Sequence, residues 1–237
     1  MPFPIRGLCY GPGMGAEGFE PTTFSGTGLA CRRGGHSVFA GLDFAVGSGQ
    51  VLVLRGANGS GKTTLLRLMA GLANLSTGIL SWDGIPIDHD PEAHGIRTRL
   101  VGHQDGVKSG LTVAENLTFA ANLQGGAPEA AIQNALHRFG LGRLADLPGR
   151  VLSAGQRHRL ALARLLVVPA PLWLLDEPTN ALDEEAFATL SAVIADHRTK
   201  GGMVVVASHG TAPTTDAVAL DLGRFTATPA PHWSDAA

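Results

Sequence analysis

The sequence predicts an α/β fold built around a mainly parallel β-sheet. Apolar runs with the length of buried strands occur at 51–54, 172–175 and 203–207. Apolar residues with helical spacing follow the first run at 62–70 and separate the other two at about 184–200. Since strands that alternate with helices form parallel sheets, a ligand is expected at the carboxyl ends of these strands.

Composition limits the classes of function. The 237 residues are 44% hydrophobic, enough for the core of one compact domain. A net charge of −2 gives no basic surface for nucleic acid or an anionic membrane, so any membrane contact should come through a protein partner. Cys9 and Cys31 lack paired spacing, which favours a reducing compartment. No apolar run approaches the roughly 20 residues that span a bilayer.

Residues 1–28 contain Gly, Pro and Thr without apolar periodicity. They are predicted to be a disordered extension, or an artefact of a start codon that truly lies downstream. The folded domain is expected to span 29–237, with the first strand-like run at 37–44 and a helical subdomain at about 105–155. Within that subdomain, Thr112 and Glu115 have the spacing of a capping box.

A glycine-rich loop lies between the strand at 51–54 and the helix at 62–70. Residues 56–63 fit the G-x-x-x-x-G-K-[ST] pattern, in the strand-loop-helix context that this pattern requires. Backbone N–H groups of such a loop and the helix N-terminus bind phosphates, with Lys62 at the β- and γ-phosphates and Thr63 on Mg²⁺. The predicted nucleotide contacts are Gly56, Ala57, Asn58, Gly59, Ser60, Gly61, Lys62, Thr63 and Thr64. The alternative is a glycine-rich loop that arose by chance.

Two adjacent carboxylates, Asp176 and Glu177, end the apolar run at 172–175. Such a pair is electrostatically costly without a cation, and a bound Mg²⁺ would remove the cost. Asp176 is the predicted metal ligand opposite Thr63, and Glu177 the predicted general base toward water. The alternative is that Asp-Glu-Pro is simply a solvated turn that leaves the sheet.

A helix is predicted to begin at Ser153, which forms a second capping box with Gln156. It could be only a cap. Gly155, however, permits a ligand to approach the backbone, and the helix N-terminus is another anion site. Because the loop at 56–63 already holds phosphates, this site is best explained if it faces nucleotide on a second subunit.

In chain order, 56–63, 152–156 and 172–177 match the Walker A, signature and Walker B motifs, so the sequence resembles the ABC ATPase family over about 29–222. The resemblance implies a P-loop NTPase, RecA-like core with an antiparallel β subdomain and a helical ABC subdomain. It also implies a homodimer that encloses two ATP molecules with Mg²⁺.

Three further residues acquire roles only through this resemblance. Gln104 matches the Q-loop glutamine, which would sense Mg²⁺ and the γ-phosphate. Asp183 matches the D-loop aspartate, which would contact the other subunit. His209 matches the switch histidine at the γ-phosphate. The alternatives are an ordinary polar loop residue, a helix N-cap and a surface histidine, respectively.

The sequence departs from the family pattern at two places. Ala154 replaces a glycine of the signature, and a methyl group there is tolerable in a helical conformation. Around 33–36, where the family places an aromatic residue against adenine, the sequence has none. Arg33 or His36 would then stack on the base, or the base would be held loosely.

The match narrows at 102–108, at Leu111-Thr112 and 115–117, and at 152–157, where the sequence resembles ATP-binding subunits of bacterial haem exporters and cytochrome c maturation systems. This resemblance implies a peripheral ATPase at the cytoplasmic face of the cell inner membrane, with integral-membrane transporter subunits as partners. It implies no haem site in the chain itself. Of the nine histidines, scattered residues such as His94, His137 and His197 lack the helical pairing or neighbouring ligands of a haem pocket, and most are expected to be exposed. The alternatives are the ATPase of a lipid, metal or amino-acid transporter, or a module that binds nucleotide without hydrolysis.

Overall fold

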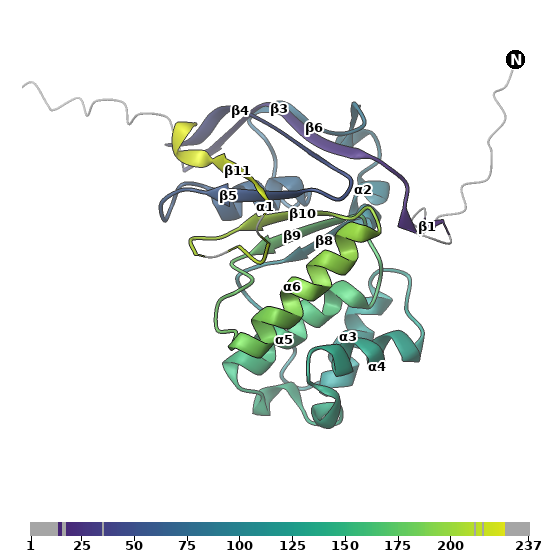
Figure 1. Cartoon of the computed structure of the whole chain (residues 1–237). Coiled ribbons are helices and arrows are strands. Elements are labelled where there is room, and N and C mark those ends of the chain that lie inside the picture. Colours follow the sequence, from purple (N-terminus) through teal and green to yellow (C-terminus); the bar gives the residue numbers. More distant parts are fainter. Residues whose placement is uncertain (1–13, 16–17, 35, 211, 215, 226–237) are drawn as a thin grey trace, which may run out of the picture.

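A computed structural model describes residues 14–15, 18–34, 36–210, 212–214 and 216–225 (Figure 1). An antiparallel sheet, a parallel sheet and a group of helices lie one below the other in that view. Within the described ranges, no helix is both long and apolar enough to cross a membrane.

The central sheet has five strands, all parallel, in the order β11-β5-β10-β9-β8. This confirms the predicted parallel sheet. Ala207 pairs with both Leu54 and Asp176, so the carboxyl ends of the three middle strands lie at one edge. The strands are β5 (Val51–Arg55), β8 (Thr98–Val101), β9 (Leu172–Asp176), β10 (Met203–Ala207) and β11 (Val218–Asp221).

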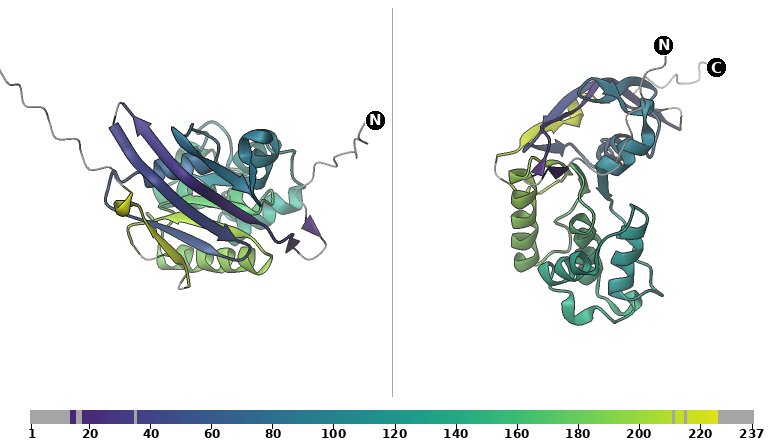
Figure 2. Two further views of the ribbon diagram at one scale, coloured as in Figure 1. Left: turned by 90° about the horizontal axis from the view of Figure 1, so that it is seen from above. Right: turned by 90° about the vertical axis from the view of Figure 1, so that its right-hand side faces the viewer.

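The second sheet is antiparallel, in the order β4-β3-β6-β7. It lies over the parallel sheet (Figure 2), and the strands β1 and β2 form a separate antiparallel pair. The bounds are β1 (Met14–Gly15), β2 (Gly18–Phe19), β3 (Thr23–Arg33), β4 (His36–Gly47), β6 (Thr77–Trp82) and β7 (Ile85–Pro86).

The expected domain start at residue 29 is wrong, because it falls inside β3. This strand begins at Thr23, pairs with β4 on one side and β6 on the other, and buries Phe24 completely. The segment 23–28 contains a single large apolar residue, so its hydrophobic pattern is too sparse to indicate a strand. Of the segment 1–28 predicted to be disordered or a start-codon artefact, residues 14–15, 18–19 and 23–28 form strands, and residues 1–13 and 16–17 lie outside the described residues.

Six α-helices complete the described fold. Helices α3 and α4 and the start of α5 pack together in the segment expected to form a helical subdomain (Figure 2). Both predicted capping boxes are present, Thr112 with Glu115 on α3 and Ser153 with Gln156 on α5. The helices are α1 (Lys62–Met69), α2 (Pro91–Arg97), α3 (Val113–Asn122), α4 (Glu129–Arg138), α5 (Ala154–Ala163) and α6 (Glu184–Thr199). Single 3₁₀ turns occur at Ile87–His89, Gly142–Leu144, Gly149–Val151, Arg164–Leu166 and Leu222–Arg224.

Alternation along the parallel strands divides the core into two clusters. Val51, Val53 and the other side chains on one face pack against the helical subdomain and α6. Leu52 and Leu54 face the opposite way, against α1 and the antiparallel sheet. The sheet is therefore buried on both faces, as its nearly continuous apolar strands predict.

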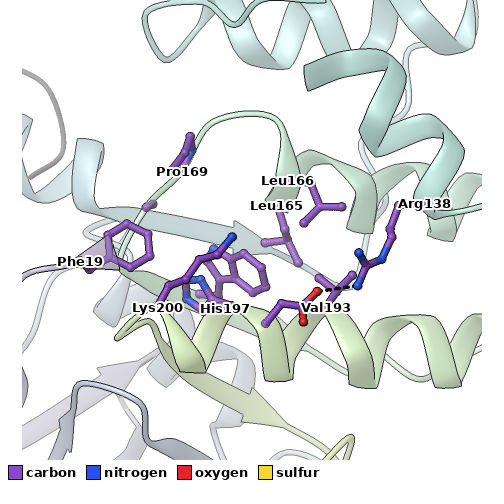
Figure 3. A pocket seen from close by; sticks show the side chains of 11 residues that line it. Phe19, Arg138, Leu165, Leu166, Pro169, Val193, His197 and Lys200 are labelled. Carbon is purple, nitrogen blue, oxygen red and sulfur yellow. Dashed lines mark hydrogen bonds and ion pairs between the residues drawn. The ribbon is translucent and has the colours of Figure 1, made fainter. Parts of the chain in front are cut away.

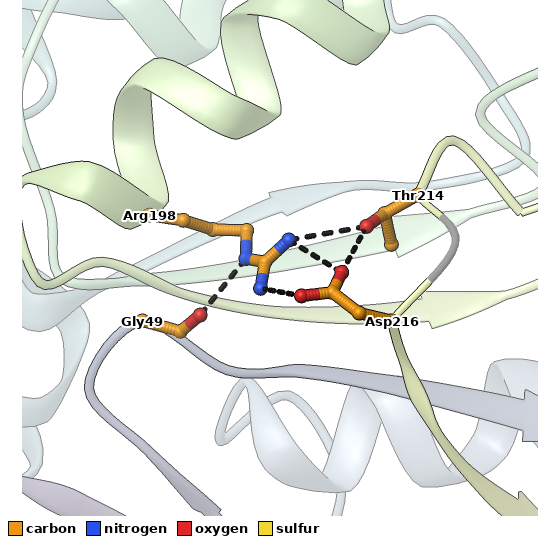
Figure 4. Close-up of polar contacts among 4 residues, drawn as sticks. All are labelled: Gly49, Arg198, Thr214 and Asp216. Atoms are coloured by element: carbon orange, nitrogen blue, oxygen red, sulfur yellow. Dashed lines mark hydrogen bonds and ion pairs between the residues drawn. The ribbon is translucent and has the colours of Figure 1, made fainter.

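The segment after β10 is braced by the guanidinium group of Arg198 at the end of α6 (Figure 4). Its Nη1 and Nη2 atoms donate to the two carboxylate oxygens of Asp216 at 2.8 and 2.7 Å, and Nη1 also donates to Thr214. The third nitrogen, Nε, donates to the carbonyl oxygen of Gly49 at 2.8 Å. This network links Thr214 and Asp216 to the end of α6 and to the turn before β5.

Candidate active site

A cleft of about 580 Å³ opens at the carboxyl ends of the parallel strands, the edge predicted to bind a ligand. Three features singled out in the sequence meet there: the glycine-rich loop, the carboxylates at the end of β9, and His209, which lies two residues after the end of β10. The lining residues are Arg33, Val38, Asn58, Gly59, Gly61, Lys62, Thr63, Thr64, His103, Asp176, Glu177, Asn180 and His209.

The glycine-rich loop joins β5 to α1 and needs glycine at its last position. Gly61 has a φ of 98°, and a Cβ atom there would lie 2.6 Å from Cγ1 of Val38. Gly61 is also the N-cap of α1 and has no side chain to satisfy the first backbone N–H groups of the helix. These donors remain available for an anion at the positive end of the helix dipole.

Lys62 is the cation of this loop. Its Nζ donates to the carbonyl oxygens of Gly56 at 2.9 Å and Ala57 at 3.1 Å. Burial lowers the pKa of this amine, and the nearby carboxylates of Glu177 and Asp176 oppose the effect. The ammonium group is thus held by backbone carbonyl oxygens of the loop, and Lys62 lines the cleft.

Thr63 and Asp176 lie together, although 113 positions separate them in the sequence. The Thr63 hydroxyl donates to Oδ2 of Asp176 at 2.9 Å. Asp176 is 3% exposed at the end of β9, whereas Thr63 is exposed at the mouth of the cleft. Two hard oxygen donors therefore converge where the sequence predicted a metal ion.

Glu177 follows β9 in a left-handed backbone conformation with a φ of 52°. Its N–H donates to the carbonyl oxygen of Ala207, which fixes the residue against the end of β10. The Oε1 atom is buried and has no hydrogen-bond partner among the described residues; Nε2 of His209 lies 3.5 Å from it. A carboxylate oxygen without a partner at the floor of a cleft is available to accept a proton.

The structure does not bring Gln104 into this cleft. Gln104 is exposed on the loop after β8, and the preceding residue, His103, lines the cleft instead. The loop is held from the other side, because Asp105 contacts His158 and Arg164 donates to the carbonyl oxygen of Gly106. Sequence reasoning missed His103; its place at the end of a parallel strand was the available signal.

The second predicted anion site also lies apart from the cleft. Ser153 is exposed at the start of α5, and its hydroxyl accepts from the N–H of Gln156 at 3.2 Å. A Cβ atom on Gly155 would lie 3.1 Å from the carbonyl oxygen of Ala181, a tight contact within the chain itself that favours glycine there. Asp183 is exposed and caps α6 by accepting from the N–H of Ala186 at 2.8 Å.

Arg33 and His36 were the two residues considered for stacking on the adenine ring. Arg33 lines the cleft, and His36 does not. Arg33 ends β3, where it pairs with His36 at the start of β4, and it lines the same cleft as the glycine-rich loop. A guanidinium plane can stack on a heteroaromatic ring in place of an aromatic side chain.

Most of the described histidines are exposed, as expected: His36, His89, His103, His137 and His209 are exposed, whereas His94, His158 and His197 are buried. His94 and His197 are 4% and 6% exposed. His197 stacks on Trp173 with ring centroids 3.7 Å apart, beside a separate cavity of about 200 Å³ (Figure 3). Burial lowers the pKa of His197 to about 4. In the described ranges, no three or more His, Cys, Asp or Glu side chains are grouped to hold a metal ion.

Comparisons with known proteins give one answer. Residues 39–180 match the model of the ABC transporter family. The cytochrome c biogenesis ATP-binding export protein CcmA of Paramagnetospirillum magneticum is 52% identical over 207 residues, which cover 86% of this chain and 95% of that protein. The protein of the same name from Rhodospirillum rubrum is 49% identical, with coverage of 88% and 89%.

Among solved structures, a putative ABC transporter ATP-binding protein from Pyrococcus furiosus has a TM-score of 0.76 at 23% identity, covering 86% of this chain and all of that one. This likeness shows the fold, a P-loop α/β core with an antiparallel sheet and a helical part. The chain belongs to the ABC transporter family and, within it, groups with the CcmA ATP-binding proteins.

Proposed function

We propose that the protein is the ATP-hydrolysing motor subunit of a membrane transport complex that delivers haem for the assembly of c-type cytochromes. The observation that carries the hydrolytic part is the buried Oε1 atom of Glu177, which has no hydrogen-bond partner among the described residues and lies beside the Thr63–Asp176 pair and Lys62. A module that only binds nucleotide would need the phosphate loop but not a base at this position.

In the proposed reaction, the γ-phosphate lies over the glycine-rich loop and accepts hydrogen bonds from the first N–H groups of α1. Lys62 turns from the carbonyl oxygens of Gly56 and Ala57 toward the phosphate oxygens. Glu177 accepts a proton from the attacking water while the water oxygen forms a bond to the γ-phosphorus. The bond between the γ-phosphorus and the bridging oxygen breaks, and this oxygen leaves with ADP. His209 donates to the γ-phosphate oxygens, where negative charge accumulates.

A divalent cation fits the donors that are present. Mg²⁺ uses one or two protein oxygens and completes its shell with phosphate and water. The Thr63 hydroxyl and the Asp176 carboxylate supply such oxygens, and their 2.9 Å hydrogen bond shows that they already converge. When bound, Mg²⁺ neutralises charge on the phosphates. Gln104 joins this shell in the proposal only if its loop turns toward the cleft.

The proposed working unit is a homodimer. Ser153, Gly155, Gln156 and Asp183 lie outside the cleft of their own chain, and Ser153 and Asp183 are exposed. In the dimer, the start of α5 from one copy faces the γ-phosphate held by Lys62 of the other, and Asp183 contacts the opposite copy. Closure around ATP and reopening after hydrolysis drive the membrane partners.

The haem pathway rests on the relatives, which are named for cytochrome c biogenesis and export. The proposed place of action is the cytoplasmic face of the inner membrane, through integral-membrane subunits and without nucleic acid. The test is haem staining of covalent c-type cytochromes in cells that lack the gene, with rescue by the wild type or Glu177→Gln.

Loss of the stained bands, restored by the wild type and not by Glu177→Gln, supports the proposal. Unchanged bands in the deleted cells would overturn the haem pathway and favour the ATPase of another transporter. Rescue by Glu177→Gln to the wild-type level would instead overturn the assignment of the base.

A further inference from the structure

The imidazole ring of His158 connects two segments of the candidate active site to the helix between them. His158 lies on α5 and is 7% exposed. Its Nδ1 atom is 2.8 Å from Oδ1 of Asp105, and its Nε2 atom is 3.0 Å from the carbonyl oxygen of Pro178. Asp105 directly follows Gln104 and Pro178 directly follows Glu177, so one ring holds the neighbours of two predicted catalytic residues.

The chemistry of the contact to Pro178 fixes its direction. A carbonyl oxygen only accepts hydrogen bonds, so the Nε2–H group of His158 donates a hydrogen bond to the carbonyl oxygen of Pro178. The Nδ1 atom then faces the side chain of Asp105 at 2.8 Å. Neither contact can break without leaving a buried polar atom of the ring unpaired, which is energetically unfavourable.

The turn that His158 holds has an unfavourable backbone conformation. Glu177 and Ala181 have φ values of 52° and 59°, where residues other than glycine are rare. Such conformations persist only where the surroundings enforce them. Helix α5 contacts this turn through His158 at Pro178, and a Cβ atom added to Gly155 would lie 3.1 Å from the carbonyl oxygen of Ala181.

The loop that contains Gln104 is held from the same helical segment. Besides the His158 contact to Asp105, the Nη2 atom of Arg164 donates to the carbonyl oxygen of Gly106 at 3.0 Å. The pKa of Arg164 is lowered by burial, which Asp105 opposes. The loop is therefore fixed at its far end while Gln104 itself is exposed.

We propose that His158 is a positioning residue that couples the Gln104 loop to the turn carrying Glu177, so that the two segments move together when nucleotide binds. This inference rests on the proposed ATP hydrolysis. It assigns to α5 a task within its own chain, besides the proposed contact of the start of this helix with a second copy.

The first test measures kcat and KM for ATP in membranes that contain the full chain with its copurifying partners. His158→Ala should lower kcat by about tenfold to a hundredfold, because small misplacements of catalytic groups cost that much, and leave KM within about threefold. The matched control is His94→Ala, which removes a buried histidine that also makes two hydrogen bonds, to Trp82 and Met69. It should leave kcat within about twofold.

An Asp105→Ala background tests whether His158 acts through its neighbour. If it does, adding His158→Ala there lowers kcat by less than about threefold, since contacts already broken cannot be lost again. If the fold-losses in kcat of the two single variants multiply in the double variant, the proposed coupling is wrong. A His158→Ala protein with wild-type kcat, or with a change in KM alone, would overturn it as well.

A second readout does not depend on turnover. Amide hydrogen exchange of the full chain should be faster at both 102–106 and 177–183 in His158→Ala. His158→Gln keeps a donor toward Pro178 and should release mainly the first segment, whereas His158→Asn keeps one toward Asp105 and should release mainly the second. Unchanged exchange at both segments in His158→Ala would overturn the proposal. A wild type without ATPase activity overturns the proposed function alone, because the exchange experiment still reports whether the two segments are linked.

Discussion

The carboxylate of Glu177 and the imidazole of His209 face each other across 3.5 Å, measured from Oε1 to Nε2. The two residues come from the ends of neighbouring strands, β9 and β10, and the backbone N–H of His209 points to the second carboxylate oxygen at 3.4 Å. Both distances are longer than that of a strong hydrogen bond, so each side chain can still form a hydrogen bond with a substrate. A proton acceptor and a donor toward phosphate can therefore act on one substrate.

Glu177→Gln should lower ATP hydrolysis by about a thousandfold while ATP still binds, because the amide keeps the shape of the side chain but accepts a proton poorly. Steady-state turnover and equilibrium binding of a fluorescent ATP analogue measure the two effects. Glu185→Gln, on an exposed position of α6, is the matched control and should behave as the wild type. Normal turnover in Glu177→Gln would contradict the role of the base.

Lys62→Met should weaken ATP binding by about tenfold to a hundredfold, since charge-assisted hydrogen bonds contribute about 1.5–3 kcal/mol. Methionine retains the length of the side chain and removes only the cation. Arg67→Met removes a cation from an exposed position of the same helix and should leave the affinity unchanged. Titration calorimetry distinguishes the two, and equal losses in both variants would indicate a general electrostatic effect instead.

Ser153→Asp should abolish ATP-dependent dimerisation, because it brings a negative charge to the helix start that is proposed to face the γ-phosphate of another copy. Aspartate is as good an N-cap as serine, so α5 should remain folded. Ser153→Asn, a neutral N-cap, is the control and should dimerise. Sedimentation of both in the Glu177→Gln background with ATP measures the effect, and a dimer of Ser153→Asp would disprove the arrangement.

The free energy of unfolding should fall as pH decreases from about 6.5 to about 4. His197 stays neutral in the fold until the pH approaches 4, whereas the unfolded chain binds a proton at this residue below about pH 6.5, so acid favours unfolding. The loss from His197 is about 3 kcal/mol at most. Burial lowers the pKa of His94 as well, which adds to the slope.

Urea unfolding between pH 4 and pH 8 tests this dependence. His197→Gln should be less stable than the wild type at pH 8, since it loses the stack on Trp173, yet its stability should vary less with pH. His137→Gln, at an exposed position, should show the wild-type profile. An undiminished slope in His197→Gln would assign the effect to other groups.

The sequence was sufficient to predict the parts of the fold in which local pattern and chemistry agree. The strand, glycine-rich loop and helix at 51–70 coincide with β5 and α1, and both capping boxes form as their spacing predicts. Asp176 and Glu177 were predicted from the carboxylates that end an apolar strand, and the structure brings Asp176 within hydrogen-bond distance of Thr63.

Other features depend on tertiary contacts that no local pattern contains. Strand β3 starts early because β4 and β6 satisfy its backbone, despite the polar side chains of Thr23 and Ser25. His94 is buried because Trp82 and Met69 supply hydrogen-bond partners that lie far from it in the sequence. The exposure of Gln104 follows from the attachment of its loop to α5, a contact between segments 53 positions apart.

The left-handed backbone of Glu177 has a consequence for how this position responds to selection. That conformation costs a residue other than glycine about 1–2 kcal/mol, and glycine adopts it freely. Glu177→Gly should therefore resist thermolysin better than the wild type while it fails to support cytochrome formation. In a library of variants at position 177, a screen for protease resistance would therefore favour Glu177→Gly. A screen for growth that depends on cytochrome formation would remove the same variant, so its rank in the two screens should be opposite.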